Sequence, residues 1–198
     1  MLSKSMQRRM AYDARNTQQD KQRLSQKICQ QVLALEEYQQ ANTVLWYLHC
    51  RSEVQTYQTV VAELQKQDKQ IVIPYCTKDS QGDNHLGLWH LEDFSELSAG
   101  TWGILEPPQQ RWGETGKEIS PEQIDMVIVP GVAFDRQCGR LGNGAGYYDR
   151  LFAHLAAQCK LIAMGFDSQI FEHILMQEHD VYMHAVITES RIYHKSSR

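Results

Sequence analysis

A short glycine-rich stretch of this chain carries the residue types that are best suited to chemistry. It reads GRLGNGAGYYDR from Gly139 to Arg150, with four glycines within eight residues. Glycines allow backbone amides to turn toward a ligand without a side chain in the way. Arg140 adds a full positive charge and a donor fork that suits phosphate oxygens. Asp149 places a carboxylate beside that anion site, where a magnesium ion bridging to phosphate would need one. The stretch therefore predicts a phosphate-binding loop with an adjacent metal ligand.

The neighbouring pattern indicates how this loop is held. An apolar run from Met126 to Val129 precedes it and predicts a buried strand, and an amphipathic pattern from Tyr147 to Ala157 predicts a helix. The helix start would add partial positive charge at the end of the loop. Glycines at this density also occur in plain tight turns, but the strand, the arginine and the aspartate together favour phosphate binding. No Lys-Ser or Lys-Thr follows the glycines, so the loop is not a Walker motif.

Length and composition limit the class of protein. The 198 residues predict one domain, spanning 1–198, that is large enough to bury a core. With 42% apolar residues, 22% charged residues and a net charge of −4, the chain resembles an ordinary globular protein and not a nucleic-acid binder. Its five cysteines contain no C-x-x-C, which argues against a disulfide framework and a zinc site. Reduced thiols, the lack of an apolar signal segment and the lack of an apolar run near ~18 residues predict a cytoplasmic protein without a membrane partner.

Alternating helical and strand patterns predict an α/β domain. Helices are expected at Ser3–Arg15, at Thr17 to about Glu37 and at Thr56–Lys66. Strands are expected at Thr43–Leu48, at Ile71–Ile73 up to Pro74, at Leu86–Leu91, at Leu161–Met164 and at Ala185–Thr188. Thr17 is expected to cap the second helix, with Asp20 at the capping-box position. The Gly- and Pro-rich region from Ser98 to Pro121 indicates a loop. This order predicts a three-layer α/β/α domain with a largely parallel or mixed sheet.

With the loop placed, the chain resembles the 5-formyltetrahydrofolate cyclo-ligase family, also called methenyltetrahydrofolate synthetases. The matching core is PGVAFDRQCGRLGNGAGYYDR, from Pro130 to Arg150, a long and specific string. Further landmarks follow in the family's order over nearly the whole chain. They are the basic pair Lys4 and Arg8, Glu-Val-x-Thr at Glu53 to Thr56, Trp-Gly-Ile-x-Glu-Pro at Trp102 to Pro107, and His179 with Asp180.

The resemblance implies an ATP- and magnesium-dependent enzyme that closes the formyl group of 5-formyltetrahydrofolate into the ring of 5,10-methenyltetrahydrofolate. ATP would phosphorylate the formyl oxygen, so that the neighbouring amine can attack and phosphate can leave. The implied ATP contacts are Lys4, Arg8, Arg140, Leu141, Gly142, Asn143, Gly144, Ala145, Gly146, Tyr147 and Tyr148. The implied folate contacts are Cys50, Glu53, Gln55, Trp102 and Asn143 to Tyr147, and the implied magnesium ligands are Asp149 and Asp180. Cys50 and Gln55 depart from the family, which often has methionine and an acidic residue there.

Two other functions stay open on the sequence. A dinucleotide-dependent oxidoreductase would use Asp167, about 20 residues past the glycines, as a ribose-binding acid. Against it, the first glycine of such a loop should stand at the strand end, and here the G-x-G-x-G run begins well past Pro130. A nucleotide-sensing or RNA-binding module could use the basic N-terminal helix, with strongly salt-dependent binding. The acidic balance of the remaining chain and the lack of an aromatic-basic sheet signature argue against it. We expect a monomer that acts on small molecules.

Overall fold

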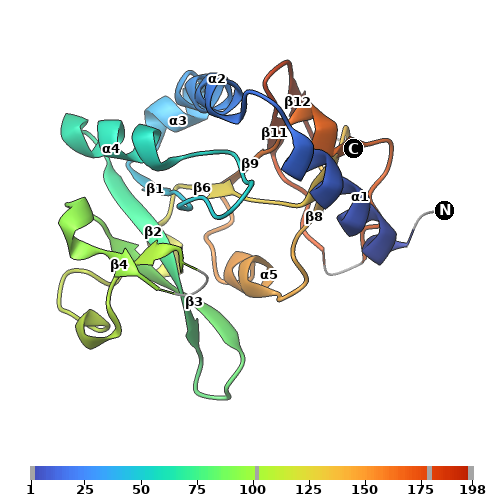
Figure 1. Ribbon diagram of the computed structural model, residues 1–198. Helices are drawn as coiled ribbons and strands as arrows, with labels where there is room; N and C mark the ends of the chain where they lie inside the picture. The colour runs from blue at the N-terminus through green and yellow to red at the C-terminus, as the bar shows by residue number, and fades with distance from the viewer. Residues whose placement is uncertain (1–2, 101–102, 178–179, 196–198) are drawn as a thin grey trace.

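The computed structural model describes residues 3–100, 103–177 and 180–195, and its centre is a seven-stranded sheet (Figure 1). The strands lie in the order β12-β11-β9-β6-β1-β2-β3. They span β1 Thr43–Leu45, β2 Gln70–Lys78, β3 Asn84–His90, β6 Met126–Val129, β9 Lys160–Met164, β11 Ala185–Ile187 and β12 Ile192–His194. The inner strands are parallel to one another, and β3 and β12 pair antiparallel at the two edges. The predicted α/β fold with a mixed sheet is therefore confirmed.

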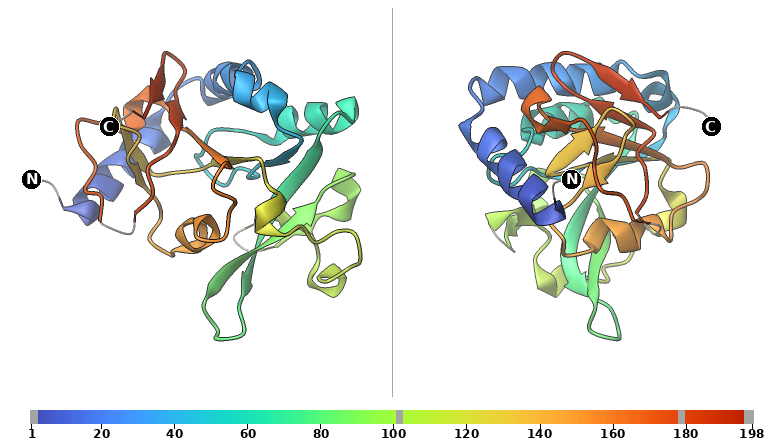
Figure 2. Two further views of the ribbon diagram at one scale, coloured as in Figure 1. Left: turned by 180° about the vertical axis from the view of Figure 1, so that it is seen from behind. Right: turned by 90° about the vertical axis from the view of Figure 1, so that its right-hand side faces the viewer.

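Helices cover both faces of this sheet, because both faces carry apolar side chains. Successive residues of a strand point to opposite faces. Val44 and Met126 belong to one apolar cluster and their neighbours Leu45 and Val127 to another. The first face is covered by α2 (Lys21–Leu33), α3 (Glu36–Gln40) and α4 (Tyr57–Lys66), and the second by α5 (Tyr147–Phe152). Figure 2 shows the sheet between these layers, with α1 (Lys4–Thr17) lying at one end of the molecule.

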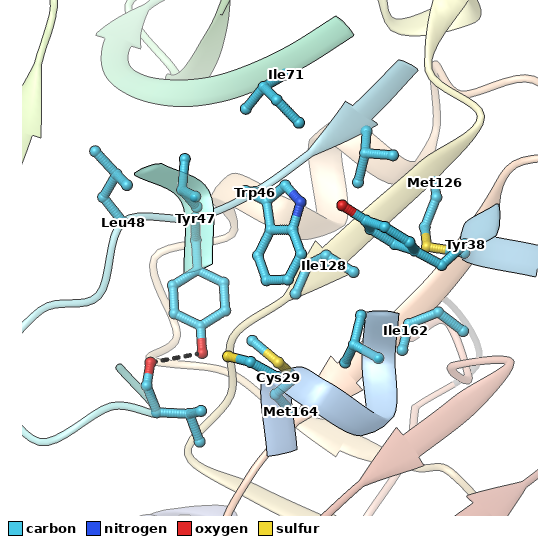
Figure 3. Packing of buried hydrophobic residues seen from close by; sticks show 14 of the residues in the cluster. Cys29, Tyr38, Trp46, Tyr47, Leu48, Ile71, Met126, Ile128, Ile162 and Met164 are labelled. Carbon is cyan, nitrogen blue, oxygen red and sulfur yellow. Dashed lines mark hydrogen bonds between the residues drawn. The ribbon is translucent and has the colours of Figure 1, made fainter. Parts of the chain in front are cut away.

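The apolar run after β1 is buried without continuing as a strand (Figure 3). The sequence predicts a strand over Thr43–Leu48, but β1 is shorter. Trp46, which is fully buried, still donates its backbone N–H to the oxygen of Val72 at 2.8 Å. Tyr47 donates its hydroxyl to the oxygen of Val54 at 3.1 Å. This bond closes the loop between β1 and α4, so the chain leaves the sheet earlier than its apolar pattern indicates.

Strand β2 continues through Pro74, which the sequence predicts as its end. Proline has no N–H to donate, so it suits only positions whose nitrogen faces away from a partner strand. The N–H of Cys76, two residues on, points away from β3 to the Glu106 carboxylate at 3.3 Å. Backbone N–H groups two residues apart in a strand point to the same side, so the Pro74 nitrogen also points away from β3. On that side β2 pairs with β1 only up to Val72, so Pro74 has no partner strand there. The missing donor therefore interrupts no ladder bond, and β2 and β3 form a long hairpin.

The helix predicted after Thr17 is in fact two helices, and its predicted cap is wrong. Thr17 is the last residue of α1. Asp20 precedes α2 with a φ of 52° and makes no side-chain cap bond, because this left-handed residue turns the chain between the two helices. α2 ends at Leu33, and α3 starts at Glu36. α5 is shorter than predicted and ends at Phe152.

Among its described residues, the region predicted as loop, Ser98–Pro121, holds short elements. They include the paired strands β4 Ser98–Ala99 and β5 Leu105–Glu106 and the 3-10 turn η3 Gln109–Arg111. Further 3-10 turns are η1 Phe94–Glu96, η4 Pro121–Gln123 and η5 Asp167–Gln169. No helix in residues 3–100, 103–177 and 180–195 is long and apolar enough to cross a membrane.

A small three-stranded sheet, which the sequence does not predict, stands between β6 and the glycine-rich loop. It contains β10 Ile170–Phe171, β7 Ala133–Asp135 and β8 Arg140–Leu141. Asp135, only 1% exposed, holds the β7–β8 turn. Its Oδ1 accepts from the backbone N–H groups of Gln137 at 2.9 Å and Gly139 at 2.8 Å. Its Oδ2 accepts from the N–H of Ile174 at 2.8 Å. This carboxylate therefore fixes the β7–β8 turn and with it the position of Arg140 at the start of β8.

Replacing Asp135 with alanine should lower the free energy of unfolding by about 3–5 kcal/mol, because three backbone N–H groups lose a charged acceptor. Urea unfolding followed by circular dichroism measures this change. Asp13→Ala is the control, because Asp13 is exposed on α1 and its loss should change stability by no more than about 0.5 kcal/mol. Equal stability of Asp135→Ala and wild type would show that the turn is held by other contacts.

Candidate active site

A cavity of about 410 Å³ lies where the chain leaves β1 and β6. From β1 the chain continues to β2 on one side, and from β6 it continues through the small sheet to β9 on the other side. Neighbouring parallel strands whose connections diverge leave a crevice at their carboxyl ends. Leu48 after β1 and Gly131 after β6 both line the cavity. Its size suits a small-molecule ligand.

The glycine-rich loop forms a wall of this cavity. The continuous segment from Gly142 to Asp149 lines it, together with Arg140. Cys50 and Glu53 line the same cavity from the loop between β1 and α4. Residues predicted to contact ATP and residues predicted to contact folate therefore line the same cavity.

Several predicted contacts do not line the cavity within the described residues: Lys4, Arg8, Gln55, Leu141 and Asp180. Leu141 is 3% exposed and packs in the small cluster beneath α1. The N–H of Gln55 bonds to the Ser25 hydroxyl at 2.9 Å, which ties this loop to α2 instead of turning it to the cavity. Trp102 and His179 lie outside the described residues. Direct ligand contact by Leu141 or Gln55 thus receives no support from the geometry.

Helix α1 fastens the glycine-rich loop. Arg8 donates Nε to the oxygen of Gly142 at 2.9 Å. One turn further along the helix, Tyr12 donates its hydroxyl to Oδ1 of Asn143. Residues four apart lie on one face of a helix, so both side chains reach the same loop. The predicted N-terminal helix is confirmed. Tyr12 is a contact that the sequence analysis missed, although its spacing from Arg8 was a signal.

Arg140 lies in strand β8, whereas the sequence predicts it within the glycine-rich loop. Its Nη2 is 2.7 Å from Oδ1 of Asp149, and Nη1 donates to the oxygen of Pro130 at 3.3 Å. The guanidinium carbon stands 5.8 Å from the ring centre of Tyr148 and 5.3 Å from that of Phe152. Burial lowers the pKa of Arg140, and the charge of Asp149 opposes this change. The pair therefore keeps a cation inside the wall and orients the Asp149 carboxylate.

The two predicted magnesium ligands each face a predicted ATP contact. Nζ of Lys4 is 2.7 Å from Oδ2 of Asp180. Nη2 of Arg140 is likewise 2.7 Å from Oδ1 of Asp149. The charge of Asp180 also opposes the lowering of the pKa of Arg140, so both acids act electrostatically on that guanidinium. The described residues hold no group of three or more His, Cys, Asp or Glu that could enclose a metal. Two carboxylates still suit magnesium, which commonly takes one or two of them together with waters and substrate phosphates.

Two further carboxylates line the cavity, Glu53 and Glu106. Burial raises the pKa of Glu53, and the N–H of Cys50, at 2.9 Å from Oε2, opposes this rise. Glu106 is 7% exposed and was missed as a site residue, although it belongs to the Trp-Gly-Ile-x-Glu-Pro landmark. Burial also raises the pKa of the Cys50 and Cys76 thiols, so both stay protonated near neutral pH. The cavity therefore offers acceptors and cations but no activated thiol from these two cysteines.

The geometry disfavours a dinucleotide-dependent oxidoreductase. The hairpin of β7 and β8 separates β6 from the G-x-G-x-G run, whereas a dinucleotide-binding loop begins at the strand end. Asp167, the candidate ribose ligand, accepts a hydrogen bond from the Ser190 hydroxyl and is not among the described residues that line the cavity.

Comparison with known proteins identifies the family. Residues 3–189 match the model of the 5-formyltetrahydrofolate cyclo-ligase family. The chain is 29% identical over 176 residues to the mouse 5-formyltetrahydrofolate cyclo-ligase, covering 86% of this chain and 85% of that protein. It is 28% identical over 181 residues to the Escherichia coli 5-formyltetrahydrofolate cyclo-ligase, covering 89% and 94%. The solved structure of Aquifex aeolicus 5,10-methenyltetrahydrofolate synthetase aligns with a TM-score of 0.81 at 26% identity, covering 100% of this chain and 95% of that one. The chain belongs to the 5-formyltetrahydrofolate cyclo-ligase family, and the prediction of an enzyme is confirmed.

Tyr12→Phe should loosen the glycine-rich loop, because Asn143 loses the hydroxyl that ties it to α1. A neutral hydrogen bond worth about 1 kcal/mol predicts roughly fivefold faster amide exchange in residues 142–146. Hydrogen exchange with mass spectrometry measures this rate. Tyr57→Phe is the matched control, because Tyr57 is 39% exposed and packs through its ring on Phe94. Unchanged exchange in Tyr12→Phe would show that α1 does not restrain the loop through this bond.

Proposed function

We propose that this member of the 5-formyltetrahydrofolate cyclo-ligase family converts 5-formyltetrahydrofolate to 5,10-methenyltetrahydrofolate in an ATP- and magnesium-dependent reaction that releases ADP and phosphate. One observation carries the proposal: the glycine-rich loop and the loop that holds Glu53 line a single cavity. A reaction between a nucleotide and a folate requires both ligands in one space. The mouse and Escherichia coli relatives, which are named for this activity, support the assignment.

The proposed phosphate site is the glycine-rich loop with its cations. Gly144 and Gly146 have φ angles of +91° and +75°, which side-chain-bearing residues rarely adopt. Successive amides in such conformations form concavities that bind anions. Arg8 bonds to Gly142 and Arg140 lines the same wall, while Lys4 is paired with Asp180, and all three provide positive charge. These features support ATP binding with the phosphates against residues 142–146.

The proposed chemistry proceeds in two steps. The formyl oxygen attacks the γ-phosphorus of ATP, an O–P bond forms, and the bond to ADP breaks. The neighbouring amine nitrogen of the folate then bonds to the formyl carbon and loses its proton, while the C–O bond breaks and phosphate leaves with the formyl oxygen. The nucleophile in each step belongs to the substrate, so the protein needs no activated thiol. Its work is to position the reactants and to neutralise phosphate charge.

Asp149 and Asp180 are the proposed magnesium ligands. Magnesium held by them would supply positive charge that neutralises the phosphates. In the structure these carboxylates are paired with Arg140 and Lys4, which are also the proposed phosphate contacts. With magnesium bound, Asp149 and Asp180 would hold the metal, and Arg140 and Lys4 would contact the phosphates.

The proposed folate contacts are Cys50, Glu53 and the segment from Asn143 to Tyr147, all of which line the cavity. Glu53 offers an acceptor for the N–H groups of a pterin ring. We further propose that the protein works as a monomer in the cytoplasm, and its five free cysteines are consistent with a reducing compartment.

A spectrophotometric assay tests the proposal directly. Purified protein with ATP, magnesium and 5-formyltetrahydrofolate should generate the near-ultraviolet absorbance of the conjugated methenyl product. Omitting ATP or adding a chelator should abolish the signal. A folded protein that gives no such absorbance under any of these conditions would refute the proposed function.

Lys4→Gln should raise the KM for ATP about 10- to 150-fold, because one charge-assisted phosphate contact is worth roughly 1.5–3 kcal/mol. The KM for folate should change much less, since Lys4 does not line the cavity beside Glu53. Steady-state kinetics with each substrate varied in turn give both constants. Lys27→Gln, an exposed position on α2, is the control. An unchanged KM for ATP in Lys4→Gln would exclude the assigned role.

Isotope transfer tests the order of the chemical steps. Substrate labelled with heavy oxygen in its formyl group should give inorganic phosphate that carries the label, one atom per turnover. The reason is that the formyl oxygen becomes bonded to phosphorus before the ring closes. Mass spectrometry of the phosphate detects the transfer, and label found only in water would disprove formyl phosphorylation.

A further inference from the structure

Arg15 is a buried cation that the proposed nucleotide contacts do not include. It lies in the last turn of α1 and lines the cavity, and its side chain is only 4% exposed. Its Nε donates to the Ser52 hydroxyl at 3.0 Å, and its Nη1 donates to the oxygen of Gly131 at 3.2 Å. Ser52 belongs to the loop after β1, and Gly131 follows β6. Arg15 therefore bridges the two loops that form the crevice.

Glu53 completes the surroundings of this guanidinium. Its Oε1 lies 4.0 Å from Nη1 of Arg15, and its Oε2 accepts the N–H of Cys50 at 2.9 Å. A buried charge is tolerated when an opposite charge and hydrogen bonds compensate it. An ionised carboxylate has about four acceptor positions. The carboxylate of Glu53 can therefore be held by Arg15 and Cys50 and still accept donors from a ligand in the cavity.

We propose that Arg15 is a positioning residue for the folate: it keeps Glu53 ionised and directed into the cavity, where the carboxylate accepts two neighbouring N–H donors of the pterin. The inference rests on the proposed function and adds to it a residue that does not touch the reacting atoms. If Arg15 served only to anchor α1, its removal would leave the ionisation of Glu53 unchanged. The two roles therefore differ in a measurable property.

The predicted pH dependence follows from the groups that face Glu53. Burial raises the pKa of Glu53, and the nearby cations Arg15 and Arg51 oppose this rise. The other titratable groups near it, whose own pKa values burial raises, are Cys50, Tyr47 and Tyr148. These three are neutral near pH 7 and cannot replace a lost cation. Removal of Arg15 should therefore raise the pKa of Glu53 further, so that the carboxylate ionises only at higher pH.

The direct test is an NMR titration of the full-length protein labelled with ¹³C at the glutamate carboxyls. Glu53→Gln assigns the Glu53 signal. Arg15→Met should move the midpoint of that signal to a pH higher by about 1 or more, since an opposite charge at this distance lowers the pKa of a carboxyl by roughly 1–3. Arg15→Lys, which keeps the charge, should restore most of the wild-type midpoint. Arg23→Met is the control, because the side chain of Arg23 is 71% exposed.

Kinetics provide the second readout. In Arg15→Met the acidic limb of kcat/KM for folate should move to higher pH by the same amount as the Glu53 midpoint. At a pH below both midpoints, kcat/KM should fall roughly tenfold when the midpoint rises by about 1. The KM for ATP should stay unchanged. Arg15→Gln also removes the charge but keeps hydrogen-bond donors, and it should move the midpoint in the same direction, which keeps the test usable if Arg15→Met does not fold.

The outcomes separate the two proposals. An unchanged Glu53 midpoint in Arg15→Met, or in Arg15→Gln if the first variant is unfolded, would overturn the role of Arg15. A wild-type protein that makes no methenyl product would overturn the proposed function, while the titration without ligands would still show whether Arg15 controls Glu53.

Discussion

The site depends on one topological constraint, the divergence of the chain from β1 and β6. These strands are neighbours and run parallel. The chain continues from β1 to its neighbour β2 and from β6 to its neighbour β9, which lie in opposite directions along the strand order. The crevice between their carboxyl ends cannot be filled by either connection. The loop that holds Glu53 and the glycine-rich loop therefore meet across it.

Helix α1 joins the loops that the sheet brings together. Arg8 and Tyr12 bind the glycine-rich loop, and Arg15 binds both the loop after β1 and the chain after β6. These polar side chains follow one another at helical spacing, so a single helix face reaches the glycine-rich loop, the loop after β1 and the chain after β6. Helix α1 thus holds in place the loops that line the cavity, although these loops lie far from it in the sequence.

Several charged side chains of this site occur in pairs. Arg140 is paired with Asp149, Lys4 with Asp180, and Arg15 lies beside Glu53. Pairing offsets the cost of removing each charge from water. Under the proposed function, a phosphate, a metal and a pterin would meet these same paired groups.

The sequence alone determined the α/β class, the strand Met126–Val129 and the glycine-rich loop. The spacing of apolar residues indicates helices and strands, and the density of glycines indicates the loop, and both are local properties of the chain. It also indicated the family through the string from Pro130 to Arg150, which the family match confirms. Only the tertiary structure decided that Pro74 stays within a strand, that Arg140 lies in the β7–β8 hairpin and that Arg15 lies beside Glu53. Each of these depends on partners distant in the chain, and short-range patterns do not contain such contacts.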